Sequence, residues 1–153
     1  MSEINTYSPT DVILTVIDHK LTGWESISIS KTSPSFIVVP GIRGKHTRVE
    51  NPDRSCTISF GLINTSKSND FMSAIHAADV TNGTAKLSLM LKDNSGNSVF
   101  SSNDAYILTY PDVMFSGGFE YRKWDIFCQT VSDYNVGGNS KPKTIFDSLF
   151  SSF

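Results

Sequence analysis

The feature that most constrains the fold is a strict alternation of apolar and polar residues in several short segments. Residues 26–31 read Ser-Ile-Ser-Ile-Ser-Lys, and residues 56–62 alternate in a similar way. A period of two places successive side chains on opposite faces of a β-strand, one toward a core and one toward water. The sequence therefore predicts a mainly β domain whose sheet has a wet face.

Other strand signals recur along the chain and are separated by turn residues. The expected strands are residues 12–17, 21–24, 26–31, 36–39, 56–62, 87–91, 99–100, 105–110 and 119–129. The apolar run 36–39 is expected to be buried, because it lacks the alternation of a half-wet strand. With a strand on each side, residues 41–54 are expected to form the tip of a long hairpin or an extended loop.

One interior helix is predicted over residues 69–79. Side-chain oxygens of Ser68, Asn69 and Asp70 can accept hydrogen bonds from the free N–H groups of a first helical turn. The apolar residues that follow at helical spacing are Phe71, Met72, Ile75 and Ala78. They form one stripe, so the helix is expected to pack on the sheet along that stripe.

The length of 153 residues fits one domain, since domains commonly have about 100–150 residues. We expect a β domain over residues 1–138, followed by a linker and a short amphipathic segment over residues 139–153. The apolar residues of that segment are Ile145, Phe146, Leu149, Phe150 and Phe153. A helix this short is not stable alone in water, so it should dock either on its own domain or on a neighbouring subunit.

Composition argues against several classes of function. A net charge of -2 argues against a nucleic-acid binder that works through a strong basic field. No apolar stretch approaches the ~20 residues that span a bilayer, so no membrane partner is expected. Cys56 and Cys128 lie in strand-like segments and are expected to be buried thiols. The three histidines His19, His46 and His76 lack metal-ligand spacing, so neither a metal nor a cofactor is expected.

Short matches to catalytic and binding motifs fail on their context. Residues 28–31 match S-x-x-K, but that motif requires a helix and this segment alternates as a strand. Residues 41–45 lack the glycine spacing and hydroxyl of a phosphate loop, and the similar G-x-x-G clamp joins helices. Residues 93–97 lack the acidic spacing of a calcium loop. The sequence therefore does not predict an enzyme.

The clearest charge cluster lies in the segment 41–54. Its charged and titratable residues are Arg43, Lys45, His46, Arg48, Glu50, Asp53 and Arg54. Two interpretations remain open: a solvated hairpin tip, or a contact element that reaches an acidic surface on another copy or partner. A long loop with both signs of charge suits registration between subunits.

Several segments in series resemble a known protein family. In chain order they are residues 7–12 (YSPTDV), 23–24 (GW), 48 (R), 65–70 (TSKSND), 92–96 (KDNSG), 122–124 (RKW) and 137–138 (GG). In this order they resemble the tail tube proteins of contractile-tailed bacteriophages. The helix entrance at 65–70 and the turn at 92–96 are the most distinctive, and residues 139–153 lie beyond the pattern.

The resemblance implies a β-sandwich or partial barrel with one flanking α-helix. In such families copies join edge to edge into hexameric rings, and the inner strands complete one β-barrel that lines a channel. The rings stack, and a long loop between early strands contacts the next ring. The matching loop here is the segment 41–54, so the resemblance implies an inter-ring contact there.

The resemblance also implies partners and a location. Genomic DNA would pass non-specifically through the channel, inside a contractile sheath, and the tube would meet baseplate and tail terminator proteins. The chain would be assembled in the host bacterial cytoplasm and reside in the virion tail. A near-neutral chain suits such a conduit, because a basic lining would hold DNA by counterion release.

The hypothesis from the sequence is a non-enzymatic, self-assembling subunit of a phage tail tube. One alternative is a carbohydrate- or partner-binding β-sandwich module of a phage baseplate or fibre. Aromatic residues at loop tips would favour such a module, but Trp24 and Trp124 lie in strand-like segments. The sequence also leaves open a secretion-type tube subunit, of the type VI or pyocin kind, and an enzyme with converging carboxylates or a Ser/His pair.

Overall fold

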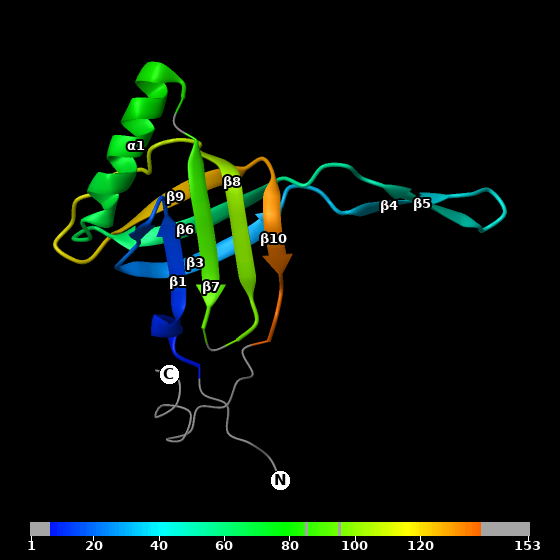
Figure 1. The fold of residues 1–153 in the computed structure, drawn as a ribbon, viewed down its shortest axis with the longest axis horizontal. Helices are drawn as coiled ribbons and strands as arrows, with labels where there is room; N and C mark the ends of the chain where they lie inside the picture. The colour runs from blue at the N-terminus through cyan, green and yellow to red at the C-terminus, as the bar shows by residue number, and fades with distance from the viewer. Residues whose placement is uncertain (1–6, 85, 95, 139–153) are drawn as a thin grey trace, which may run out of the picture.

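The computed structural model describes residues 7–84, 86–94 and 96–138, which form a bent antiparallel sheet with a helix beside it and a hairpin at one end (Figure 1). The sheet has the order β2-β1-β7-β8-β9-β6-β3, and β10 also pairs with β8. Its strands are β1 (Val12–Val16), β2 (His19–Lys20), β3 (Trp24–Lys31), β6 (Cys56–Ile63), β7 (Leu87–Asp93), β8 (Val99–Ile107), β9 (Tyr121–Cys128) and β10 (Val131–Asn135). The remaining elements are the 3-10 turn η1 (Pro9–Asp11), the hairpin strands β4 (Phe36–Pro40) and β5 (His46–Glu50), and the helix α1 (Ser68–Asn82).

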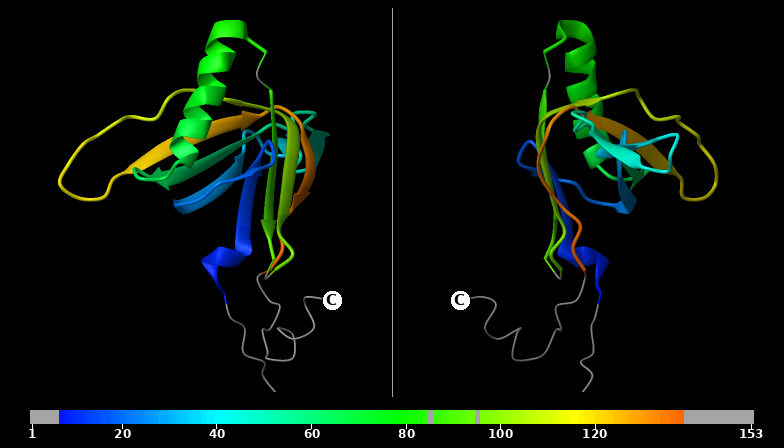
Figure 2. Two further views of the ribbon diagram at one scale, coloured as in Figure 1. Left: turned by 60° about the vertical axis from the view of Figure 1, so that its left-hand side comes forward. Right: turned by 90° about the vertical axis from the view of Figure 1, so that its right-hand side faces the viewer.

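The sheet bends where β8 changes partner. The second half of β8 pairs with β9 through Ala105 and Cys128, and its first half pairs with β10 through Ser102 and Val131. β10 follows β9 after a two-residue connection, so the two act as one bent strand along β8. The hydroxyl of Ser102 donates to the carbonyl of Thr130 at 2.6 Å and holds the bend. The sheet consequently folds over itself into a partial barrel (Figure 2), which confirms the predicted mainly β fold class.

The core lies between the two halves of the folded sheet. Its largest fully buried side chains include Leu14, Ile58, Phe60, Leu62, Leu87, Phe100, Trp124 and Ile126. Burying each such side chain contributes about 1.5–3 kcal/mol. The alternation of the sequence correctly predicted these inward faces, because alternate residues are buried along β6 and along β9 from Trp124 onward.

The two cysteines are adjacent in this core and are free thiols, as predicted. Cys56 on β6 lies directly opposite Cys128 on β9, and both are buried. Burial raises the pKa of the Cys128 thiol to about 11. Both thiols therefore stay protonated at neutral pH, and they act as small apolar core residues.

The helix α1 begins one residue before its predicted start and extends about one turn beyond its predicted end. It continues to Asn82, because Gly83 adopts a left-handed conformation (φ 67°) and its N–H donates to the carbonyl of Asp79 at 2.6 Å. Met72 is buried, but Ala78 is exposed, so the predicted apolar stripe ends early. Figure 1 shows the reason, since the last turns of α1 rise beyond the sheet. Within the described residues, no helix combines the length and apolarity needed to cross a membrane.

The side chain of Asn69 links the start of α1 to the core, which a simple N-cap residue would not do. Its side-chain amide donates to the carbonyls of Ile63 at 2.9 Å and Ser66 at 3.2 Å. Its side-chain oxygen accepts a hydrogen bond from the indole N–H of Trp124 at 3.0 Å. The distinctive 65–70 segment thus fixes the start of α1 against β6 and β9.

Candidate assembly interface

The β4–β5 hairpin projects from the body at one end of the longest axis (Figure 1). Its strands pair only with each other, from Phe36 opposite Glu50 to Pro40 opposite His46. All residues of both strands are exposed. The prediction that residues 36–39 are buried is therefore wrong, because the body sheet passes from β3 directly to β6 and leaves the hairpin outside. An isolated two-stranded hairpin is only marginally stable in water, so its apolar strands favour a partner.

The two faces of the hairpin differ in chemistry, because directly opposed residues of an antiparallel pair lie on the same face. One face, called here the apolar hairpin face, consists of Ile37, Val39, Thr47 and Val49. The other carries Phe36, Val38, Pro40, His46, Arg48 and Glu50. The apolar hairpin face has no charged side chain, and a contiguous exposed apolar surface marks an interaction site.

The tip of the hairpin, residues 41–45, presents one apolar side chain followed by two cations. The N–H of Gly41 donates to the carbonyl of Lys45 at 2.7 Å, and Gly44 has a φ of 82° that favours glycine. Ile42 is fully exposed, at 107% of its reference area. Arg43 and Lys45 follow it in the turn and are exposed as well.

The seven residues that the sequence singled out do not form one cluster. Arg43 and Lys45 lie at the tip, and His46, Arg48 and Glu50 lie on β5. Asp53 and Arg54 lie at the base, beyond the strands. The guanidinium of Arg48 sits 4.3 Å from the centre of the Phe36 ring, a cation–π contact. The loop predicted over 41–54 is thus the second half of a hairpin, and its charges are spread along the length of that hairpin.

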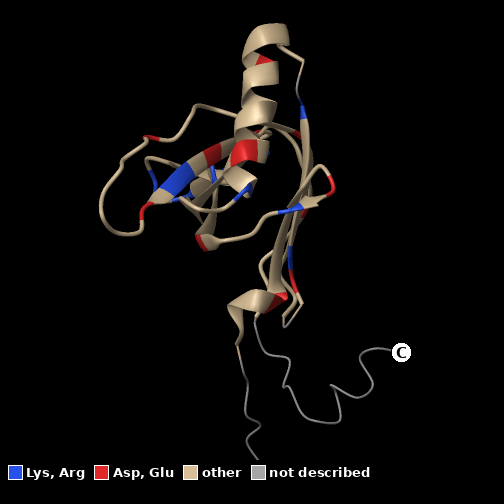
Figure 3. Cartoon of the chain, turned by 90° about the vertical axis from the view of Figure 1, so that its left-hand side faces the viewer, with Lys and Arg blue, Asp and Glu red and all other residues tan. Residues whose placement is uncertain are grey.

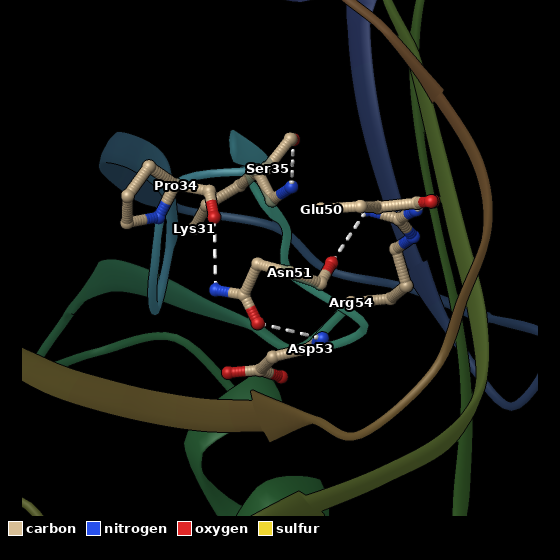
Figure 4. A network of polar contacts seen from close by, with 7 residues as sticks. All are labelled: Lys31, Pro34, Ser35, Glu50, Asn51, Asp53 and Arg54. Atoms are coloured by element: carbon tan, nitrogen blue, oxygen red, sulfur yellow. Dashed lines mark hydrogen bonds and ion pairs between the residues drawn. The ribbon is translucent and has the colours of Figure 1, made fainter. Parts of the chain in front are cut away.

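A polar network joins the two chain segments that connect the hairpin to β3 and β6 of the body (Figure 4). The side-chain amide of Asn51 donates to the Pro34 carbonyl and to the Ser33 hydroxyl, both at 2.9 Å. The Asn51 side-chain oxygen accepts a hydrogen bond from the Asp53 N–H at 3.1 Å. Hydrogen bonds from Ser55, and then from the Ser33 hydroxyl, lower the pKa of the Asp53 carboxyl. At the same base, Arg54 forms an exposed ion pair with Glu50 at 3.2 Å.

The loop between β8 and β9, residues 108–120, is a second exposed apolar surface that sequence reasoning missed. Its exposed large apolar side chains are Leu108, Tyr110, Val113, Met114, Phe115 and Phe119. It carries two acidic residues, Asp112 and Glu120, and no lysine or arginine. Figure 3 shows red but no blue along this loop. The signal available in the sequence was the apolar triplet 113–115 beside a glycine pair, outside any strand pattern.

The β8–β9 loop is braced at several points. The Arg122 guanidinium donates to the Met114 carbonyl at 3.3 Å and lies 5.5 Å from the Phe115 ring centre. The Ser116 hydroxyl donates to the Glu120 carboxylate at 2.6 Å. The ring of Tyr110 meets that of the buried His76 edge to face, 4.4 Å between centres. These contacts hold the exposed apolar side chains of the loop in place against α1 and β9.

A third surface is the outer face of β3 and β6, which carries hydroxyl groups. Ser28 lies opposite Ser59, and Ser30 lies opposite Thr57. We call these four residues the hydroxyl face. β9 extends it with Asp125, whose carboxylate accepts a hydrogen bond from the Ser59 hydroxyl. β3 also forms one end of the described sheet, so its second edge has no strand partner within the described residues.

The remaining predictions for sites fall outside these surfaces. The C-terminal docking residues Ile145, Phe146, Leu149, Phe150 and Phe153 lie outside the described residues. Within the described chain, no group of three or more His, Cys, Asp or Glu side chains could hold a metal ion. The histidines have structural contacts instead: the ring of His19 stacks on that of Phe71, with 4.3 Å between centres.

No family model matches the sequence. The sequence is 30% identical over 148 residues to structural protein ORF10 of Pseudomonas phage KPP10, covering 90% of this chain and 85% of that protein. The fold is similar to a solved structure of the anti-feeding prophage cap, a tube-terminating cap, with a TM-score of 0.59 at 13% identity over 88% of this chain and 95% of the other. It is also similar to a chain in the sheath-tube complex of an extracellular contractile injection system, with a TM-score of 0.54 at 14% identity over 87% and 91%.

Proposed function

The chain belongs to a family of bacteriophage structural proteins, and from this premise we propose that it is the subunit of a phage tail tube. It is a structural protein and not an enzyme, and a structural protein of a phage is a component of the virion. In the proposal, copies form hexameric rings that stack into a tube inside a contractile sheath. Genomic DNA passes through the channel of this tube without sequence-specific binding.

The observation that carries the proposal is the open, bent sheet that ends in the eight-residue strand β3. An exposed edge strand presents unpaired N–H and C=O groups and favours pairing with another chain. Closed barrels remove such edges. Ring formation would supply a neighbour for the edge of β3 and close the partial barrels of several copies into one continuous wall.

The hydroxyl face suits the inner surface of that wall. Ser28, Ser30, Thr57 and Ser59 offer uncharged polar groups, and the adjacent β9 positions Lys123 and Asp125 carry opposite charges. A surface of this kind exerts no net electrostatic attraction on the phosphate backbone. A row of lysines would instead release counterions from the DNA and bind it. We therefore place the hydroxyl face toward the channel and α1 toward the outside, where the sheath would lie.

The remaining contacts of the proposal follow the sequence expectations. The hairpin, with Arg43, Lys45 and Arg48, sets the register between stacked rings, and the C-terminal residues from Ile145 onward dock on the same or a neighbouring copy. Baseplate and tail terminator proteins would contact the two ends of the tube, which assembles in the host cytoplasm. Deleting residues 145–153 tests the C-terminal role: lost assembly with a stable monomer favours docking on a neighbour.

Electron microscopy of the purified chain tests the tube itself. We expect tubes with a central channel at high concentration, and a reconstruction should show the hydroxyl face toward the channel. A chain that stays monomeric under all conditions, and gives no tubes in lysates, would contradict the tube role. Tubes with the hydroxyl face outside would contradict only the orientation.

A tube-terminating cap is the second candidate, favoured by the similarity in fold to the cap of the anti-feeding prophage. The two roles differ in how the subunit propagates. A tube subunit adds ring after ring, whereas a cap forms a single ring and stops. The length distribution of particles in the same micrographs therefore separates them.

A further inference from the structure

We propose that the hairpin tip of one copy docks on the β8–β9 loop of another copy. This inference rests on the proposed function, because it names the receptor surface for the hairpin. The occupant is a second copy of this chain rather than a different protein. Three observations support it: matching apolar surface, opposite charge, and the places of the two elements in the molecule.

The hairpin supplies an apolar end surrounded by positive charge. Ile42 at the tip is fully exposed, and the two strands behind it carry the apolar hairpin face. Residues 41–49 contain Arg43, Lys45 and Arg48 and no aspartate or glutamate. Such an element is suited to a surface that is apolar at its centre and acidic at its rim.

The β8–β9 loop has that complementary chemistry. Phe115 is 85% exposed, and Met114 beside it is exposed as well. Asp112 and Glu120 lie on either side of these residues in the chain; the loop itself has no lysine or arginine, and the one guanidinium described beside Phe115 is that of Arg122 on β9, 5.5 Å from the ring centre. Charge complementarity of this kind selects the partner and the register, while the buried aromatic and aliphatic side chains supply most of the affinity.

The two elements lie at opposite ends of the molecule along its longest axis (Figure 1). A contact between different patches of identical chains is heterologous, so each copy retains a free hairpin at one end and a free loop at the other. Such contacts close into rings or continue as helical stacks. One kind of contact between hairpin and loop can therefore propagate the assembly.

Disulfide cross-linking between two single variants tests the pairing. One chain carries Arg43→Cys and the other, with a tag that changes its mass, carries Gly117→Cys, and a mild added oxidant accepts the two electrons of disulfide formation. Both positions are exposed and lie next to Ile42 and close to Phe115, which stay in place. The native Cys56 and Cys128 are buried and do not compete. We expect the mixed disulfide to form at least about tenfold faster than with the control Val80→Cys, because docking raises the effective concentration of the two thiols. Val80 is also exposed but lies on α1.

Charge reversal gives an independent readout. Arg43→Glu/Lys45→Glu and Asp112→Lys/Glu120→Lys should each weaken assembly, and the chain with all four substitutions should recover it. A chain with all four that assembles no better than the two parents would overturn the pairing. Absence of the mixed disulfide overturns the pairing even where tubes form. Absence of tubes while the disulfide forms overturns the proposed tube function and leaves the pairing standing.

Discussion

The β6–β9 pair and the β4–β5 hairpin are both antiparallel ladders that contain apolar side chains on one face, yet their burial is opposite. In β6, and in β9 from Trp124 onward, alternate residues are buried, and Ile58, Trp124 and Ile126 belong to the core. In β4–β5 no residue is buried, although Ile37, Val39 and Val49 lie on one face. The difference shows that local pattern makes a strand, while its burial depends on what the rest of the chain, or another chain, places against it.

The largest expected effect is a difference in the free energy of unfolding when isoleucine is replaced by alanine in each of the two ladders. Ile58→Ala should lower the free energy of unfolding by about 2–5 kcal/mol, because it leaves a cavity in a closed core. Ile37→Ala should change it by less than about 0.5 kcal/mol, since that side chain is half exposed. Urea unfolding of dilute monomer measures both. Assembly should respond in the reverse order among folded variants, and equal losses of monomer stability at the two sites would break the comparison.

A smaller effect is expected where the body joins its helix. Asn69→Ala leaves the buried indole N–H of Trp124 without its acceptor and removes two bonds to carbonyls. We expect the free energy of unfolding to fall by about 1–3 kcal/mol. Tryptophan fluorescence during unfolding measures this change. The matched control Asn103→Ala, at an exposed position of β8, should be nearly neutral. If both variants unfold alike, the link between α1 and the core is not an important source of stability.

Replacing one glycine in the body and one in the β8–β9 loop with alanine compares how strongly the backbone is constrained in the two regions. Gly83 ends α1 at φ 67° with open space around it, so Gly83→Ala meets only backbone strain. That strain is about 1 kcal/mol, or a fall in Tm of roughly 2–4 °C. Gly117 also has open space but no positive φ, and Gly117→Ala should leave Tm unchanged. A larger fall for Gly117→Ala would mean that the loop is more constrained than the body.

The smallest effect is expected at the base of the hairpin. Arg54 and Glu50 form an exposed ion pair, and exposed pairs contribute about 0–1 kcal/mol. A double-mutant cycle with Arg54→Gln and Glu50→Gln should give a coupling energy below about 0.5 kcal/mol in the monomer. A coupling well above about 1 kcal/mol would indicate that the hairpin is held to the body more firmly than its exposure suggests.

Much of the body could be predicted from the sequence, because its signals are local. The alternation in β3 and β6, the helix after Ser68, and the buried thiols all follow from residue pattern and propensity. β10 escaped prediction because residues 131–135 are mostly polar and give no strand pattern, and their pairing with the first half of β8 depends on the fold of the rest of the sheet. The predicted break within β8 was wrong, since the exposed polar positions Asn103 and Asp104 resembled a turn.

The candidate surfaces were less accessible to sequence reasoning. The charge cluster drew attention to the segment that forms the tip and second strand of the hairpin, but an apolar run such as residues 36–39 reads the same whether it faces a core or another molecule. Residues 111–118 of the β8–β9 loop show no period, so Val113, Met114 and Phe115 gave no strand or helix signal. Its significance depends on the exposure of Phe115 and Met114, which only the fold determines.

The polar network around Asn51 lies where the hairpin meets the body, and we expect the hairpin to tilt more easily there than it would on a packed core. A packed core would transmit any tilt of the hairpin into the body, whereas here a tilt strains a few hydrogen bonds of about 0.5–1.5 kcal/mol each. In the proposed tube, small rotations at this junction in many subunits would let the tail curve, and Ser33, Asn51 and Asp53 would re-form their hydrogen bonds after each rotation. The elasticity of the whole filament would then reside in a few small polar side chains, while the wall of each ring keeps its shape.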